Sequence, residues 1–194
     1  MIQPHPVRLL TLAIREPLPG KVLHRMIPET SPEEAAKRYR AIALTTLRQL
    51  RGLKETSIRL EIQPHDADEA IRFWLLPLLA DRWLADGNTY KSDGWEIDFG
   101  TNHHGAPIQA RGEILCPFLG TRWFHAALAG IGTSVGSVLG PGESGGTYLE
   151  CRIDDGLPIR RLPKLPIIET AADWQAALDS PIGPALARSM DEQR

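Results

Sequence analysis

The 194-residue chain has little of several features that would narrow its function. Its only cysteines, Cys116 and Cys151, form no CxxC pair and have no histidine at zinc-finger spacing. A zinc-finger or disulfide-stapled fold is therefore excluded, and we expect two buried thiols in a reduced, cytoplasmic protein. No apolar run approaches the roughly 20 residues of a membrane helix, and the first residues lack the pattern of a secretion signal.

Neither sign of charge predominates overall, because 22 Lys and Arg residues nearly balance 24 Asp and Glu residues and the formal net charge is -2. We therefore expect neither nucleic acid nor a membrane as a partner. With 42% hydrophobic residues, the composition is typical of one globular domain, which we place over residues 1–194. The cations concentrate in the first 60 residues, and six of them fall on one predicted helix, where a solvated face is favoured over an anion site. These six are Lys37, Arg38, Arg40, Arg48, Arg51 and Lys54.

The N-terminal third predicts a strand, a helix and a second strand. The run VRLLTLAI at 7–14 is typical of a strand buried on both faces. Ser31, Pro32 and Glu34 predict the start of a helix, with Glu34 closing a capping box. Residues 57–63 alternate as a second strand, so we expect a βαβ unit in a parallel sheet.

The remaining elements are less regular. We expect helices at 66–79 (broken before Pro77), at 121–129 (capped by Thr121) and at 170–178 (capped by Thr170), and one or two helical turns after Pro181. Strands are expected at 95–99, 110–116, 134–139 and 147–153, and the rest of 81–110 stays unassigned.

Two loops are candidate binding sites. The loop after the first strand, EPLPGKVLHRM, holds Lys21, His24 and Arg25, and ligands of open α/β sheets lie beyond the carboxyl ends of strands. A phosphate site is one interpretation of this loop, and a solvated turn is the other. Gly140–Tyr148 is rich in glycine, which lets a ligand approach the backbone, but a tight hairpin turn explains it equally well.

Four motifs, in order, carry a family resemblance that extends from residue 7 to about 178. They comprise Pro17, Pro19, Gly20, Lys21, Val22 and Arg25; then Cys116-Pro117-Phe118-Leu119; then Gly140, Pro141, Gly145, Gly146 and Leu149; then Leu162, Pro163, Leu165, Glu169, Thr170 and Asp173. The chain resembles the bacterial glycosyltransferase-A-like family of nucleotide-diphospho-sugar transferases, relatives of the phospholactate and molybdenum-cofactor guanylyltransferases. The resemblance implies an α/β, Rossmann-like three-layer sandwich of glycosyltransferase-A type, with a mainly parallel sheet.

The departures from the family pattern concern its charged positions. The family's loop lysine falls on Leu23, its main metal-binding aspartate on Leu115 and the first aspartate of its late pair on Ile167. The acids left near any metal are Glu143 and Glu169. Because Mg²⁺ and Mn²⁺ bind carboxylate oxygens, the leucine favours no metal cofactor over Mg²⁺ or Mn²⁺.

Three functional hypotheses follow. As the resemblance implies, Lys21 and Arg25 would contact the phosphates of a nucleotide or nucleotide sugar that approaches Gly145 and Gly146, in a transferase with reduced or metal-independent catalysis. Arg160 and Arg161 are further cations for a metal-free site. Alternatively, the chain is a non-catalytic pseudoenzyme that binds a partner or forms a homodimer.

The third hypothesis is an unrelated hydrolase that uses the carboxylates around Trp95. Asp93, Glu96 and Asp98 surround this tryptophan, and paired carboxylates can do acid–base work, although a solvated strand face is favoured. The adjacent His103 and His104 are interpreted as part of a surface loop rather than as metal ligands.

Overall fold

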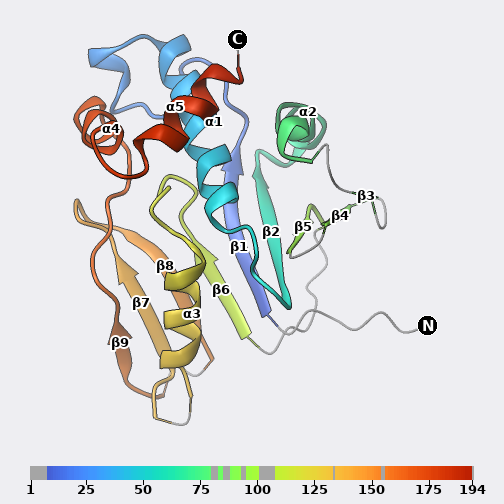
Figure 1. Ribbon diagram of the computed structural model, residues 1–194, viewed down its shortest axis with the longest axis vertical. Coiled ribbons are helices and arrows are strands. Elements are labelled where there is room, and N and C mark those ends of the chain that lie inside the picture. The colour runs from blue at the N-terminus through green and yellow to red at the C-terminus, as the bar shows by residue number, and fades with distance from the viewer. Residues whose placement is uncertain are drawn as a thin grey trace.

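The computed structural model describes residues 8–79, 83–84, 88–92, 95–100, 108–132, 134–153 and 156–193. Within them, nine strands form one sheet in the order β3-β4-β5-β2-β1-β6-β8-β7-β9 (Figure 1). The strands are β1 (Arg8–Arg15), β2 (Thr56–Gln63), β3 (Trp83–Leu84), β4 (Thr89–Ser92), β5 (Trp95–Asp98), β6 (Ile108–Gly112), β7 (Ser137–Pro141), β8 (Thr147–Arg152) and β9 (Ile159–Arg161). The helices are α1 (Pro32–Gln49), α2 (Asp68–Leu79), α3 (Thr121–Gly130), α4 (Ala171–Leu178) and α5 (Gly183–Asp191), with 3-10 turns at Ile27–Glu29 and His65–Ala67.

The centre of the sheet is parallel. Strands β5, β2, β1 and β6 run in one direction, and β1 pairs with β2 along its whole length, as the βαβ pattern predicts. Antiparallel pairs lie toward the two edges. From β1 the chain adds β2 and then β5 on one side of β1, and it then returns to add β6 on the opposite side of β1. A topological switch point therefore lies between β1 and β6. The predicted Rossmann-like α/β fold class is confirmed.

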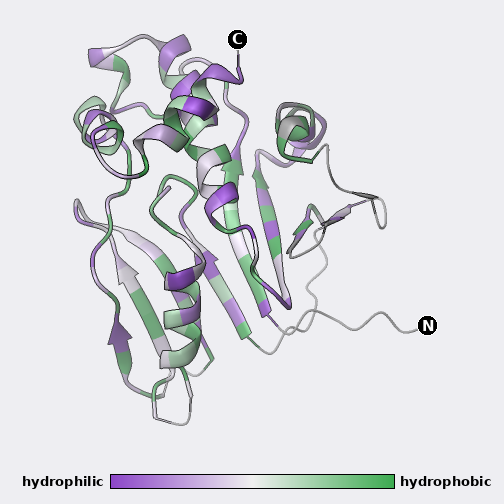
Figure 2. Cartoon of the chain, viewed as in Figure 1, coloured by the Kyte–Doolittle hydropathy of each residue, from purple (hydrophilic) through white to green (hydrophobic). Residues whose placement is uncertain are grey.

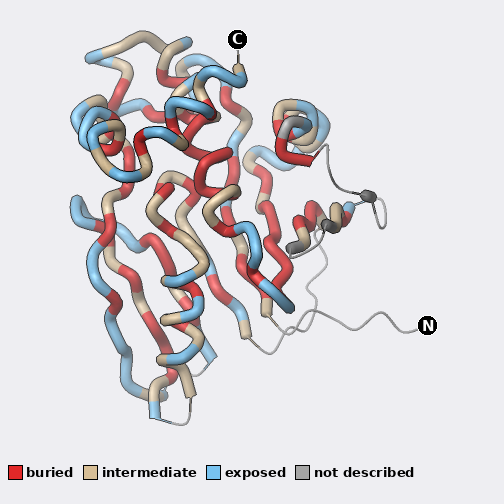
Figure 3. The backbone as a smooth tube through the Cα atoms, in the orientation of Figure 1, coloured by how far each residue is buried: buried red, intermediate tan, exposed pale blue. Residues whose placement is uncertain are grey.

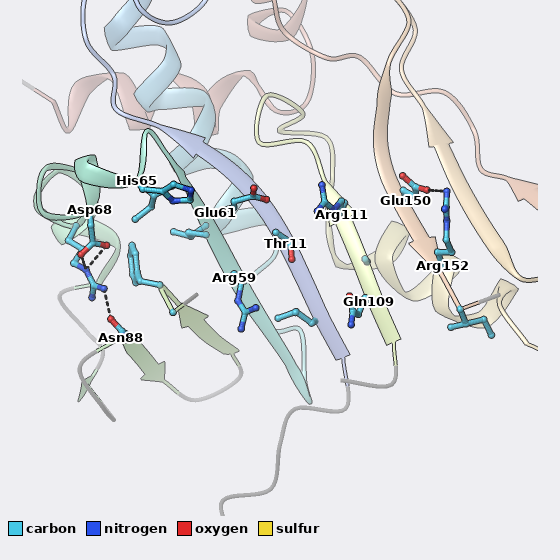
Figure 4. A pocket seen from close by; sticks show the side chains of 18 residues that line it. Thr11, Arg59, Glu61, His65, Asp68, Asn88, Gln109, Arg111, Glu150 and Arg152 are labelled. Carbon is cyan, nitrogen blue, oxygen red and sulfur yellow. Dashed lines mark hydrogen bonds and ion pairs between the residues drawn. The ribbon is translucent and has the colours of Figure 1, made fainter. Parts of the chain in front are cut away.

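The two faces of the central strands differ in character. Leu10, Leu12 and Ile14 of β1 are fully buried in the main hydrophobic core, together with the inward face of α1 (Figures 2 and 3). The alternate residues, such as Thr11 on β1 and Arg111 on β6, line a broad concavity of about 1210 Å³ on the other face (Figure 4). The period-2 alternation of strands therefore separates an apolar face from a polar one.

The C-terminal tail changes the interpretation of the basic helix. It forms α5, which packs on α1 through Leu186 and Ser189, both fully buried. Arg48 donates to Ser189 at 2.9 Å and pairs with Glu192, while Arg38 lies over the Trp174 ring of α4 at 5.4 Å. The prediction of a solvated cationic face is therefore wrong for Arg38, Arg40 and Arg48, which are partly buried. Arg51 and Lys54 lie beyond the end of α1.

Helix signals were partly correct. Ser31 caps α1 by accepting the Glu34 N–H at 3.1 Å, but the Glu34 carboxylate accepts from Arg38 instead of closing a capping box. Around α4, by contrast, Thr170 and Asp173 form a complete capping box. Helix α3 begins after Gly120 rather than with a Thr121 cap. Helix α2 continues unbroken to Leu79, so the break expected before Pro77 does not occur.

Two strands have bounds that differ from those expected from the sequence. Strand β6 occupies 108–112 rather than 110–116, because Cys116 N–H turns back to the Glu113 carbonyl at 3.2 Å. Strand β7 begins at Ser137, three residues later than expected. Strands β5 and β8 match the predictions closely. Both cysteines are buried free thiols, and no helix among the described residues is long and apolar enough to cross a membrane.

Candidate functional site

The carboxyl ends of β1 and β2 open onto a cavity of about 460 Å³. Its lining comprises Arg15, Glu16, Leu18, Lys21, Gln63 and Pro64. Two cations thus stand at the edge where ligands of open α/β sheets bind. Arg15 is the last residue of β1, and its backbone N–H donates to the Tyr39 hydroxyl at 2.7 Å, which ties this strand end to α1. The structure therefore places Lys21 in the same cavity as Arg15, a residue that the sequence motifs did not include.

Glu113 directly follows β6 and is the second group that the sequence analysis missed. It is partly buried, and its Oε1 accepts the Leu115 N–H at 3.0 Å. Burial raises the pKa of Glu113; the Leu115 N–H lowers it, the Glu169 carboxylate raises it and Arg15 lowers it. Glu113 thus interacts with both Glu169 and Arg15, on the β6 side of the switch point. The sequence did not indicate a role for Glu113, because the residue pattern predicts a strand at 110–116 with Glu113 in its middle.

Arg25 and Glu169 come together from opposite ends of the chain. Their side chains form an ion pair of 2.7 Å, with 64% and 40% of the respective side-chain surface exposed. Glu169 precedes α4, where its backbone N–H donates to the Asp173 carboxylate at 3.1 Å. Because water screens an exposed pair, we assign it less than about 1 kcal/mol. His24, in the same loop as Arg25, is exposed.

Gly145 and Gly146 lie in the turn between the antiparallel strands β7 and β8, as the hairpin alternative predicted. Their φ angles of 108° and 71° fall in the region that favours glycine. Glu143, in the same turn, is exposed, and its backbone N–H donates to the Leu165 carbonyl at 3.0 Å. Its carboxylate forms no bond with another described residue, so no contact joins it to Glu169.

The three apolar replacements belong to the protein interior. Leu23 and Ile167 are 8% and 7% exposed, and Leu115 is packed against the same core. Ile167 lies so close to the β7–β8 turn that a Cβ added to Gly142 would come within 2.7 Å of its Cδ1. Apolar packing therefore accounts for the side chains at all three positions.

The described residues contain no group of three His, Cys, Asp or Glu side chains arranged to hold a metal ion. The candidate acids are Glu113 and Glu169, and the second already pairs with Arg25. Magnesium usually binds one or two carboxylates together with substrate phosphates. The donor set of the described residues therefore does not fit a preformed metal cage.

Two of the three carboxylates around Trp95, those of Glu96 and Asp98, form ion pairs. Asp98 is 2% exposed and accepts from the buried Arg59 at 2.9 and 3.1 Å, so the expected solvated face is wrong for this residue. Glu96 pairs with Lys91 at 3.1 Å. Asp93, His103 and His104 lie outside the described residues. Arg160 and Arg161 lie on the exposed strand β9, where a Cβ added to Gly130 of α3 would meet the Arg160 side chain.

Structural comparison finds solved proteins with a similar architecture. A candidate nucleotide-diphospho-sugar transferase from Desulfovibrio desulfuricans G20 matches with a TM-score of 0.64 and 16% identity over 96% of each chain. The chain thus has the nucleotide-diphospho-sugar transferase type of fold.

Two further solved structures match less closely. A protein of Mycobacterium tuberculosis H37Rv matches with a TM-score of 0.47 and 13% identity, over 89% of this chain and 97% of that one. A 4-diphosphocytidyl-2C-methyl-D-erythritol synthase from Anaerococcus prevotii gives 0.45 and 12%, over 97% and 100%. No family model and no curated protein matches the sequence.

Proposed function

We propose that this chain binds the diphosphate part of a nucleotide or nucleotide sugar at the carboxyl ends of β1 and β2, and that any transfer reaction is slow and independent of metal. The observation that carries the proposal is the cavity lined by both Arg15 and Lys21 at the carboxyl ends of β1 and β2. Two cations at one concave site can neutralise two phosphate charges without a divalent ion.

Arg25 is a third phosphate contact in this proposal. It must first leave Glu169, and this costs little because the Arg25 side chain is largely exposed and that of Glu169 is partly exposed. The turn at Gly145 and Gly146 carries no Cβ atoms, which lets a ligand approach the backbone there. The exchange of Glu169 for a phosphate on Arg25 would release the carboxylate toward Glu113.

We expect slow catalysis because apolar side chains stand where a metal-dependent transferase needs carboxylate ligands. In a metal-dependent transferase the ion stabilises negative charge on the leaving phosphate. Leu115 and Ile167 offer no oxygen ligand, and the raised pKa of Glu113 weakens it as an anionic donor. Cations alone would have to stabilise the leaving group, which favours binding over rapid transfer.

A second candidate is a non-catalytic protein that retains the fold for partner binding. The burial of Leu23 and Ile167 in the core favours it, because these side chains stabilise the fold at positions where a charged residue would serve a ligand. Under this alternative the cavity at Arg15 and Lys21 holds no nucleotide.

The two candidates are separated by thermal shift with nucleoside diphosphates and nucleotide sugars, each with Mn²⁺ or with a chelator. A rise in melting temperature that persists in chelator and is lost in Arg15→Ala and Lys21→Ala supports the first. Lys54→Ala is the matched control, because it removes an exposed cation that precedes β2, at the end of the strand opposite the cavity. A rise only with Mn²⁺ would overturn the metal-independent mode, and no rise with any ligand would favour the second candidate.

A further inference from the structure

A groove between α1 and α2 carries an unusual share of exposed apolar surface. It has a volume of about 510 Å³, and its lining includes Leu18, Arg40, Leu44, Phe73, Trp74 and Leu76. Among the described residues, five large hydrophobic side chains are exposed, and three of them lie here: Leu18 at 44%, Phe73 at 73% and Leu76 at 49%. Such clustering marks an interaction site, whereas single exposed apolar residues do not.

The same groove holds polar atoms that lack partners. Five buried side-chain atoms of the described residues make no hydrogen bond, and three of these belong to groove residues: Arg40 Nε, Trp74 Nε1 and Gln193 Oε1. A buried donor or acceptor left unpaired is costly, so a native structure normally satisfies it. Unpaired polar atoms therefore concentrate beside the exposed apolar side chains of the groove.

The charge of Arg40 restricts the chemistry of the groove's occupant. Arg40 is partly buried and forms no ion pair with another described residue. Of the two acids that line the groove, Glu192 is held by Arg48 at 2.5 Å, and Glu16 forms no bond with Arg40. The occupant should therefore bring apolar side chains to Leu18, Phe73 and Leu76, and a carboxylate to Arg40.

Helix α2 itself carries that combination. Glu69, Phe73 and Leu76 stand at positions i, i+4 and i+7, so they share one helix face. All three are exposed, and the Glu69 carboxylate has no partner among the described residues. One surface thus presents both the groove and side chains that suit it, which is the requirement for an interface with two-fold symmetry.

We propose that two copies of this chain associate through this surface. Phe73 and Leu76 of each protomer would enter the groove of the other, and Arg40 would pair with the partner subunit's Glu69. The inference goes beyond nucleotide binding and rests on different residues, although Glu16 and Leu18 also line the cavity with Arg15 and Lys21. Each copy would thereby border the other's ligand cavity.

Sedimentation equilibrium of the full chain over a wide concentration range tests the proposal. We expect a reversible dimer, and Phe73→Glu should weaken dimerisation by about tenfold or more. Ile159→Glu is the matched control, since Ile159 is an exposed hydrophobic residue (59%) on the distant strand β9. A wild-type chain that stays monomeric, or an unchanged dimer in Phe73→Glu, would overturn the proposal.

Charge reversal tests the orientation of the two copies. Glu69→Arg and Arg40→Glu should each weaken the dimer, and the double variant should restore it. Because Glu69 is exposed and pairs with no other residue in the part of the chain that the structure describes, Glu69→Arg keeps the test valid even if Arg40→Glu fails to fold. A dimer that Glu69→Arg leaves unchanged, with folding checked by circular dichroism, would contradict the proposed pairing.

Discussion

The phenol ring of Tyr148 on β8 lies directly against the backbone of Gly140 on β7. A Cβ added to Gly140 would come within 2.3 Å of the ring carbon Cζ, closer than any real contact. Tyr148 is fully buried, and its hydroxyl donates to the Pro163 carbonyl at 3.0 Å. The glycine is thus required for close packing of strand and ring, in a segment whose glycines first suggested ligand binding.

Gly140→Ala should destabilise the protein by about 1–3 kcal/mol, because the ring must move from a well-packed site. Urea unfolding of purified protein measures the change. Gly132→Ala is the control, since a Cβ there meets no atom within 4 Å. Equal stability of the two variants would show that the Tyr148 ring has room to move.

Removal of one member of the buried Arg59–Asp98 pair should be costly. Asp98→Ala leaves a guanidinium that is 8% exposed without its carboxylate, so we expect a loss of about 3–5 kcal/mol. Glu96→Ala on the same strand is the control, because its pair with Lys91 is more accessible to water and should contribute less than about 1 kcal/mol. Thermal and urea unfolding give both values, and a mild effect at Asp98 would mean that Arg59 finds another partner.

Glu113 should make stability depend on pH. Its folded pKa is raised above the ordinary 4.5, so the folded state holds this proton more tightly than the unfolded state does. The resulting stabilisation is fully present below the unfolded pKa and is lost as pH rises through the folded pKa. Glu113→Gln keeps an acceptor for the Leu115 N–H and removes this loss. The melting temperature of the variant should therefore rise relative to that of the wild type as the pH is raised from 4 to 8. If the melting temperatures of the two proteins differed by the same amount at every pH in that range, the result would contradict a raised pKa of Glu113.

Both thiols should resist modification in the folded state. Burial raises the pKa of Cys116 to about 12 and that of Cys151 to about 11, so the reactive thiolate is scarce near neutral pH. Alkylation should therefore be slow in buffer and fast in denaturant, with both sites resolved by mass spectrometry. Rapid labelling of either site under native conditions would mean that its region opens locally.

Much of the fold could be predicted because its signals are local. The Ser31 cap needs only the Glu34 N–H three residues later, and the Thr170 cap needs only Asp173. The apolar run before Ile14 indicated a strand of the central sheet without reference to any other element. Such signals depend on backbone hydrogen bonds and on the period of hydrophobic residues, both of which lie within a few positions of sequence.

The site was less predictable, since its charges acquire their roles from distant partners. Lys21 and Arg25 were identified by motif, yet the structure joins the first to Arg15 and the second to Glu169. Glu113 was overlooked because the expected strand at 110–116 put it mid-strand, whereas β6 ends at Gly112 and the Cys116 N–H turns back to the Glu113 carbonyl. No pattern around Arg15 or Glu113 records these neighbours.

The sequence by itself determined the alternation of strands and helices, the caps and the buried apolar faces, since each depends on residues close along the chain. Only the tertiary structure decided which charges are buried, paired or left open. Asp98 is neutralised by Arg59, 39 positions away, whereas Arg40 has no ion-pair partner among the described residues and lines a groove completed by α2 and the C-terminal residues. The physical reason is that the energy of a charge depends on what surrounds it in space, and segments far apart in the chain supply those surroundings.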